Sequence, residues 1–171
     1  DMNLPEDNIL RLAEKAKVMI FDHHLGNEIK QVFHENPVIK GKDPNLYPSA
    51  SWIVNDYLGN DVNIFALLGI VGDHEQKIKS NTKFDKIINN FCKKNNLTFD
   101  DLHRMVYLFD SNYKIGDKKA VEEAPHILLE IESFKDISEN KKWIKNYKML
   151  NEELTKQLNL PSNEVNGIVL K

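Results

Sequence analysis

Three consecutive residues, Asp22, His23 and His24, carry the side chains of this chain that are best suited to chemistry. They follow Val-Met-Ile-Phe at residues 18–21, a continuous apolar run typical of a strand covered on both faces. The carboxyl ends of parallel strands are where α/β sheets place ligand sites, and burying these polar groups without a use would cost free energy. We therefore interpret the three residues as a functional cluster. The alternative is a strand end whose histidines are merely solvated.

Two further carboxylates stand where they could join this cluster. Asp73 follows an apolar segment and a glycine, and Asp1 precedes a helix, at the expected end of a preceding strand. Imidazole nitrogens combined with carboxylate oxygens suit Mn²⁺ or a similar divalent ion, whereas structural Zn²⁺ sites would use cysteines. Two such ions would activate a water molecule and neutralise the charge that develops on a phosphodiester. We expect Asp1, His23 and Asp73 to converge at one edge of a sheet.

The first half of the chain predicts alternating helices and strands around these residues. The expected elements are a helix from Pro5, strands at 18–21 and 31–33, and helices at 49–58 and 64–71. The last segment is apolar enough for a strand, but Ala66, Leu67 and Leu68 are strong helix formers. A helix followed by a buried strand indicates a parallel sheet. We therefore expect an α/β fold: a parallel β-sheet with flanking helices, its N-terminal strand missing, followed by an all-helical region.

From Lys83 onward the sequence predicts helices alone. The first expected helix contains residues 84–91, and the second follows a cap at Thr98. The third spans 118–132 with an interruption near Pro125, and the fourth spans 139–158. The last one carries an apolar stripe close to a heptad seam: Trp143, Tyr147, Leu150, Leu154 and Leu158. This stripe either packs on the domain or forms a connector to another domain. The expected domains are 1–82, 83–160 and the start of a further segment at 161–171.

Phe21-Asp22-His23-His24 resembles the motif that names the DHH phosphoesterases, a family that includes the RecJ-type nucleases. Further segments stand in the order of that family's motifs: Asp1, Asn36-Pro37, Ser49-Ala50-Ser51 and residues 66–73 ending in Asp73. The resemblance covers about residues 1–75. Residues 108–114 resemble the helical part of archaeal RecJ-like proteins.

The resemblance implies a role for each matching residue. Asp1 would bridge two metal ions, His23 would bind one of them, and Asp73 would complete the shell of that ion. His24 would contact the scissile phosphate or stabilise the leaving oxygen, and Asp22 would orient an imidazole. His74 and Glu75 have no fixed role in the family pattern and are expected at the rim. The implied cofactor is Mn²⁺, two ions per complete site, with Mg²⁺ as an alternative.

The resemblance implies a RecJ-like exonuclease acting on single-stranded DNA, RNA or short oligonucleotides, with cyclic dinucleotides and pAp left open. The family's first motif, an Asp-x-Asp segment, and its C-terminal substrate-binding domain are not found in this chain. We therefore expect an incomplete fragment that binds metal weakly and hydrolyses little. Two alternatives stay open: an inactive RecJ-like scaffold subunit of a DNA replication complex, which would bind replication or repair proteins, and an α/β module whose DHH is coincidental.

Composition adds few constraints on function. The net charge of −3 gives no global bias toward nucleic acid, and no apolar run reaches membrane-spanning length. The single cysteine, Cys92, cannot form an internal disulfide and indicates a cytoplasmic setting with a buried, inert thiol. A group of residues in the helical region either contacts nucleic acid or forms a solvated face and packing residues: Tyr113, Lys114, Lys118, Lys119 and Trp143.

Overall fold

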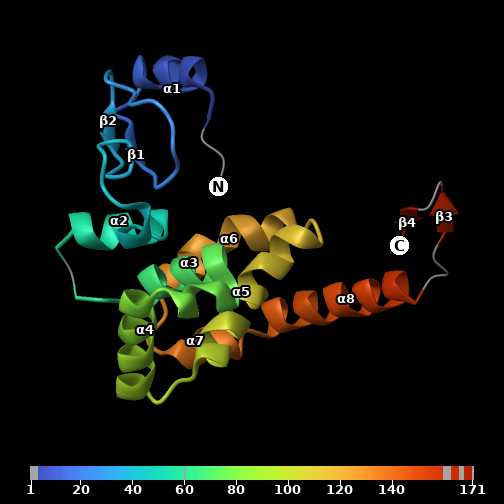
Figure 1. Cartoon of the computed structure of the whole chain (residues 1–171). Coiled ribbons are helices and arrows are strands. Elements are labelled where there is room, and N and C mark those ends of the chain that lie inside the picture. The colour runs from blue at the N-terminus through green and yellow to red at the C-terminus, as the bar shows by residue number, and fades with distance from the viewer. Residues whose placement is uncertain (1–3, 60, 160–162, 166–167, 171) are drawn as a thin grey trace. The chain divides into compact units, whose positions relative to one another are not determined.

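The computed structural model describes residues 4–59, 61–159, 163–165 and 168–170, the last two ranges as backbone only. The chain divides into two units, Asp1–Leu102 and His103–Lys171, and each is described by itself. Figure 1 labels the helices and strands along the chain. The division falls inside one helix, α5 (Phe99–Lys114). A compact unit need not be a domain, so the domain boundaries at residues 82 and 160 remain a prediction.

The first unit begins with helix α1 (Glu6–Ala13) and two short strands, β1 (Met19–Phe21) and β2 (Phe33–Glu35). Two carboxylates in the first turn of α1 face the positive end of its dipole. The strands pair in parallel, with Ile20 opposite His34, so that their carboxyl ends lie at the same edge. The second strand lies about two residues later in the chain than predicted.

Four helical segments follow in the first unit. They are α2 (Ala50–Tyr57), α3 (Ile64–His74), the 3-10 helix η2 (Glu75–Ser80) and α4 (Thr82–Asn95), after a short 3-10 turn η1 (Pro44–Leu46). The side chains of Ser49, Asn63 and Asn81 accept hydrogen bonds from backbone N–H groups at the starts of α2, α3 and α4. Helix α3 supplies the centre of the core, because Leu67, Ile70 and Val71 are completely buried.

The predicted fold class, an α/β domain with a parallel β-sheet, is wrong. Most described residues are helical, and the parallel sheet consists of two three-residue strands. The apolar segment at 64–71 is the helix α3, so it cannot extend the sheet. The strand at 18–21 is also not covered on both faces, since Met19 is 44% exposed. Without further apolar segments to pair with, β1 and β2 remain a small appendage to a helical unit.

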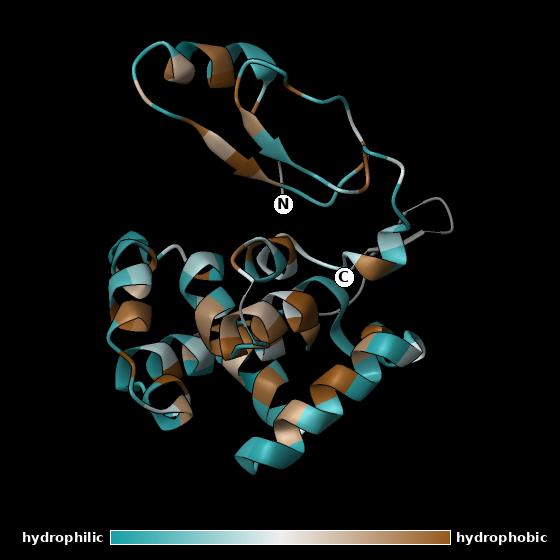
Figure 2. Ribbon diagram, turned by 90° about the vertical axis from the view of Figure 1, so that its left-hand side faces the viewer, coloured by the Kyte–Doolittle hydropathy of each residue, from teal (hydrophilic) through white to brown (hydrophobic). Residues whose placement is uncertain are grey.

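The second unit contains the rest of α5, α6 (Lys118–Leu129), α7 (Phe134–Ser138) and α8 (Lys141–Leu158). Two strands, β3 (Asn163–Val165) and β4 (Ile168–Leu170), pair antiparallel after α8. Helix α6 runs through Pro125 without the predicted interruption. Figure 2 shows that apolar residues gather where helices meet and that outward helical faces are mostly hydrophilic.

Helix α8 is packed along its first half only. Trp143 is completely buried and Asn146 nearly so, whereas every residue at 151–159 is exposed. The stripe predicted on this helix is therefore divided, with Leu154 and Leu158 outside the core. Packing on the unit accounts for the first half, and the connector interpretation remains a prediction for the second. Among the described residues, no helix combines the length and apolar character needed to cross a membrane.

Candidate functional site

Two of the predicted metal ligands lie together in the first unit. His23 follows β1 by two residues, and Asp73 lies in the last turn of α3, fifty positions later in the sequence. The Nε2 atom of His23 is 3.5 Å from Oδ2 of Asp73. The two side chains are 14% and 20% exposed, although Asp73 as a whole residue, backbone included, is exposed. The third predicted ligand, Asp1, lies outside the described residues.

The carboxylate of Asp22 organises the loop that carries both histidines. Its Oδ1 atom accepts hydrogen bonds from the backbone N–H groups of His23, at 2.9 Å, and His24, at 3.2 Å. The same oxygen lies 2.7 Å from Nδ1 of His24. Its Oδ2 accepts from Nδ2 of Asn36, at 3.2 Å. Both oxygens are engaged within the protein, which places Asp22 as an orienting group beside His24.

Asn36 is a site residue for which the sequence predicted no role, although Asn36-Pro37 stands among the segments that resemble the family's motifs. It is completely buried, and its Nδ2 donates to the backbone oxygen of His24 as well as to Asp22. Its Oδ1 accepts from the backbone N–H groups of Val38 and Ile39. One amide thus ties the end of β2 to the histidine loop. Its position before Pro37 gave a turn signal, but nothing local indicated its distant partners.

Burial shifts the pKa values of both potential ligands. The pKa of His23 is lowered, first by burial and then by the neighbouring His24, whose ring centroid lies 4.3 Å from that of His23. Burial raises the pKa of Asp73, partly countered by His24. A lowered pKa keeps the imidazole neutral at pH 7. The pair is therefore a neutral imidazole beside a carboxylate, not an ion pair.

The Nε2 atom of His23 is buried and has no hydrogen-bond partner among the described residues. The backbone of Tyr47 hydrogen-bonds the same ring. Since Nε2 is unpartnered, that bond falls to Nδ1, and the lone pair of Nε2 is left available 3.5 Å from Oδ2 of Asp73. Histidines that bind metal ions usually donate their other ring N–H to a backbone or carboxylate oxygen in this way.

The described residues bring together two donor atoms of this kind and no group of three or more His, Cys, Asp or Glu side chains. His74 does not join the pair, because its Nε2 lies 2.8 Å from the backbone oxygen of Pro48. Glu75 ends α3 with a left-handed backbone and an exposed side chain. Both residues thus lie beside the His23–Asp73 pair without contributing a donor to it.

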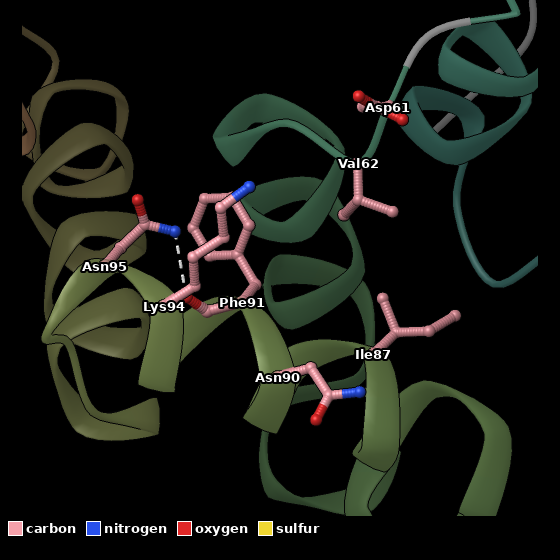
Figure 3. Close-up of a pocket in the computed structure, with 7 residues that line it drawn as sticks. All are labelled: Asp61, Val62, Ile87, Asn90, Phe91, Lys94 and Asn95. Carbon is pink, nitrogen blue, oxygen red and sulfur yellow. Dashed lines mark hydrogen bonds between the residues drawn. The ribbon is translucent and has the colours of Figure 1, made fainter.

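Two cavities in the first unit differ in their relation to this pair. A cavity of about 280 Å³ is lined by His23 itself, together with residues of the 44–48 segment and η2. A larger one, of about 440 Å³, lies between the 61–62 segment and α4, where Val62 and Ile87 point toward one another (Figure 3). The larger cavity has no predicted site residue in its lining. The smaller cavity is therefore the better candidate for a substrate site, because His23 lines it.

The proposed nucleic-acid contacts of the helical region fit the solvated-face interpretation better. Lys114 pairs with Asp110 on the same helix, and Lys119 lies 3.6 Å from Glu123. Trp143 is completely buried and so cannot stack on a base. Tyr113 is 75% exposed. Of these residues, Tyr113 alone has an aromatic ring open to the solvent.

No protein-family model matches the chain, and no curated protein matches it at a significant level.

Proposed function

We propose that this chain belongs to a Mn²⁺-dependent phosphoesterase, with His23 and Asp73 as ligands of one metal ion. The observation that carries the proposal is the unpartnered Nε2 of His23, 3.5 Å from Oδ2 of Asp73. A buried nitrogen without a hydrogen bond is costly, and a bound cation would satisfy its lone pair. The best candidate activity is a RecJ-like exonuclease acting on single-stranded nucleic acid or short oligonucleotides.

The spacing of the two donor atoms fits a shared cation. Two donor atoms 3.5 Å apart could both reach one cation, because metal–nitrogen and metal–oxygen bonds are each about 2.1 Å long. One imidazole and one carboxylate suit Mn²⁺, with Mg²⁺ as the harder alternative, whereas a thiolate set would favour Zn²⁺. The described part of the chain supplies two ligands, so we expect weak binding unless further donors join.

A divalent ion bound here would supply a water molecule of lowered pKa and positive charge against a phosphate. The residues of the chain would orient the substrate around it. Asp22 accepts a hydrogen bond from Nδ1 of His24 at 2.7 Å, which leaves Nε2 of that ring free to meet a phosphate oxygen. The His24 side chain is 45% exposed, as a substrate-contacting group must be. Its partner Asp22 is buried and acts by positioning.

Mn²⁺ binding to the chain can be measured from the loss of the electron paramagnetic resonance signal of free Mn²⁺. His23→Ala and Asp73→Asn should each weaken binding by at least about tenfold, because each removes one of two donors. His126→Ala is the matched control, since it removes an exposed histidine from α6 in the second unit. Its affinity should equal that of the wild type.

Equal affinity in the wild type and His23→Ala would refute the assignment of the ligand. No Mn²⁺ binding at all would favour the alternative of an inactive scaffold subunit. Hydrolysis is tested separately, on an end-labelled single-stranded oligonucleotide with Mn²⁺. We expect slow release of mononucleotides that is lost in Asp73→Asn. We place the activity in the cytoplasm, because the one cysteine is buried and unpaired.

A further inference from the structure

The cavity of about 280 Å³ beside His23 has two walls that are hydrogen-bonded to each other. One wall is the 44–48 segment, and the other is the end of α3 with η2. The Nε2 atom of His74 lies 2.8 Å from the backbone oxygen of Pro48, and Nδ2 of Asn81 donates to the backbone oxygen of Asn45, also at 2.8 Å. These two bonds cross from wall to wall. They hold the cavity in shape without a ligand.

The lining has the chemistry of an anion site. No carboxylate lines this cavity among the described residues, although acidic side chains outnumber basic ones in the chain. Lys77 lines it and has no ion-pair partner in the part of the chain that the structure describes. Lys79, two residues later, lies instead over the ring of Phe99, 4.3 Å from the centroid. Of these two lysines of η2, Lys77 can therefore offer its ammonium group to an anion in the cavity, whereas Lys79 is held over an aromatic ring.

The rest of the lining suits a heteroaromatic ring. Tyr47 is half-buried, and the flanking Pro48 and Ile78 are buried. Asn45 also lines the pocket and carries a side-chain amide oxygen, whereas the Asn81 amide is already hydrogen-bonded to Asn45 and to the start of α4. Bases stack on tyrosine rings, and amide side chains hydrogen-bond to the edges of bases. A volume of about 280 Å³ lies near the small end of ligand pockets, which fits one nucleotide unit.

We infer that this cavity, here called the Tyr47 pocket, binds a single nucleotide unit, with the base against Tyr47 and the phosphate at Lys77. This inference rests on the proposed function, since His23 belongs both to the pocket lining and to the proposed metal site. A phosphate held by Lys77 in this pocket would bring the scissile bond to the metal ligands, since His23 also lines it. In this arrangement the pocket would hold the terminal nucleotide of a single strand, and the enzyme would cut at that end.

Adenosine 5′-monophosphate is the probe, titrated calorimetrically into the chain in the presence of EDTA. Tyr47→Leu should lower the affinity by roughly fivefold or more, because it removes the ring on which the base stacks. Lys77→Ala should lower it by a similar factor, because it removes the positive charge at the phosphate. The matched controls are Lys79→Ala, from the same helix, and Tyr57→Leu, a half-exposed tyrosine outside the pocket. Both controls should stay within twofold of the wild type. Lys77 is exposed, so its replacement leaves the fold intact.

The absence of binding in the millimolar range would overturn the inference, as would equal losses in Lys77→Ala and Lys79→Ala. Ribose 5-phosphate and inorganic phosphate are titrated as further probes. If either binds as tightly as the nucleotide, the base has no place in the pocket and the assignment fails. Because EDTA removes metal ions, these results are independent of Mn²⁺ binding. A failure of the metal proposal and a failure of the nucleotide inference are therefore seen in different experiments.

Discussion

Gly69 of α3 lies against Ser51 of α2. A Cβ atom added to Gly69 would clash with Oγ of Ser51 and would lie 2.8 Å from the Ser51 Cβ. That serine is held in place, since its hydroxyl lies 2.9 Å from Oγ of Ser49 and donates to the backbone oxygen of Ala66 at 3.2 Å. A neighbour with two hydrogen bonds cannot move aside cheaply. The glycine therefore sets the distance between the helix that carries Asp73 and its neighbour.

We predict that Gly69→Ala destabilises the protein by about 1–3 kcal/mol, the range for overpacking a core, although alanine is the better helix former. Urea unfolding measures the change. Gly26→Ala is the control, because nothing lies within 4 Å of its added Cβ, and it should be nearly neutral. Ser51→Gly combined with Gly69→Ala should recover part of the loss. A Gly69→Ala variant as stable as the wild type would contradict this close packing.

The residues of the candidate site differ in how well the sequence predicts them. His23 and Asp73 each follow an apolar segment, and their expected meeting is seen as the 3.5 Å contact. Asn36 and Tyr47 lie in turns, and their partners are brought to them only by the fold. Local patterns carry no information about such distant contacts, which is why no role in the site was predicted for either residue. The metal itself stays a prediction.

At the start of α6, the Asp117 side chain accepts a hydrogen bond from the backbone N–H of Ala120 and another from Nδ2 of Asn146. These bonds, together with Lys142 at 3.8 Å, lower the pKa of Asp117. The ionised carboxylate of Asp117 is thus more stable in the folded state than in the unfolded state. The contribution to stability is present above the unfolded pKa, about 3.9, and is lost as the pH falls through the lower folded value.

We predict that Asp117→Asn lowers the melting temperature by a few degrees at pH 7, because asparagine still caps the helix but carries no charge. The difference from the wild type should shrink below about pH 4, as the wild-type carboxylate becomes protonated. Thermal melts followed by circular dichroism at several pH values measure it. The comparison is made at each pH, since Glu123 and Glu153 also have lowered pKa values. A difference that stays constant from pH 7 to pH 2 would contradict the prediction.

Helices were easier to predict than the sheet, for a physical reason. The start of α4 or α8 is specified by an asparagine cap and an apolar face within a dozen residues. A sheet depends on partners elsewhere in the chain, and β1 finds one described partner, β2. The apolar run at 18–21 looked like a central strand because its composition does not reveal how many neighbours it will have. The prediction of an α/β fold was wrong for this reason.

Each of the two units contains one of the two tryptophans of the chain. Trp52 packs edge-on against Phe84 in the first unit, with ring centroids 5.0 Å apart. Trp143 packs against Phe109 in the second unit, with centroids 4.8 Å apart. Fluorescence of a chain with a single tryptophan therefore reports on the packing within one unit. Trp143→Phe leaves the reporter of the first unit, and Trp52→Phe leaves that of the second.

The proposed metal ligands lie in the first unit, so Mn²⁺ should stabilise that unit first. At ten times its dissociation constant, the ion would add about 1.4 kcal/mol, enough to raise the melting temperature of such a unit by several degrees. We predict this rise in the Trp52 signal of Trp143→Phe and a smaller one, or none, in the Trp143 signal of Trp52→Phe. Adding His23→Ala should abolish the rise in both. A rise confined to Trp143 would place the bound ion in the wrong unit, and one that survives His23→Ala would assign it to other ligands.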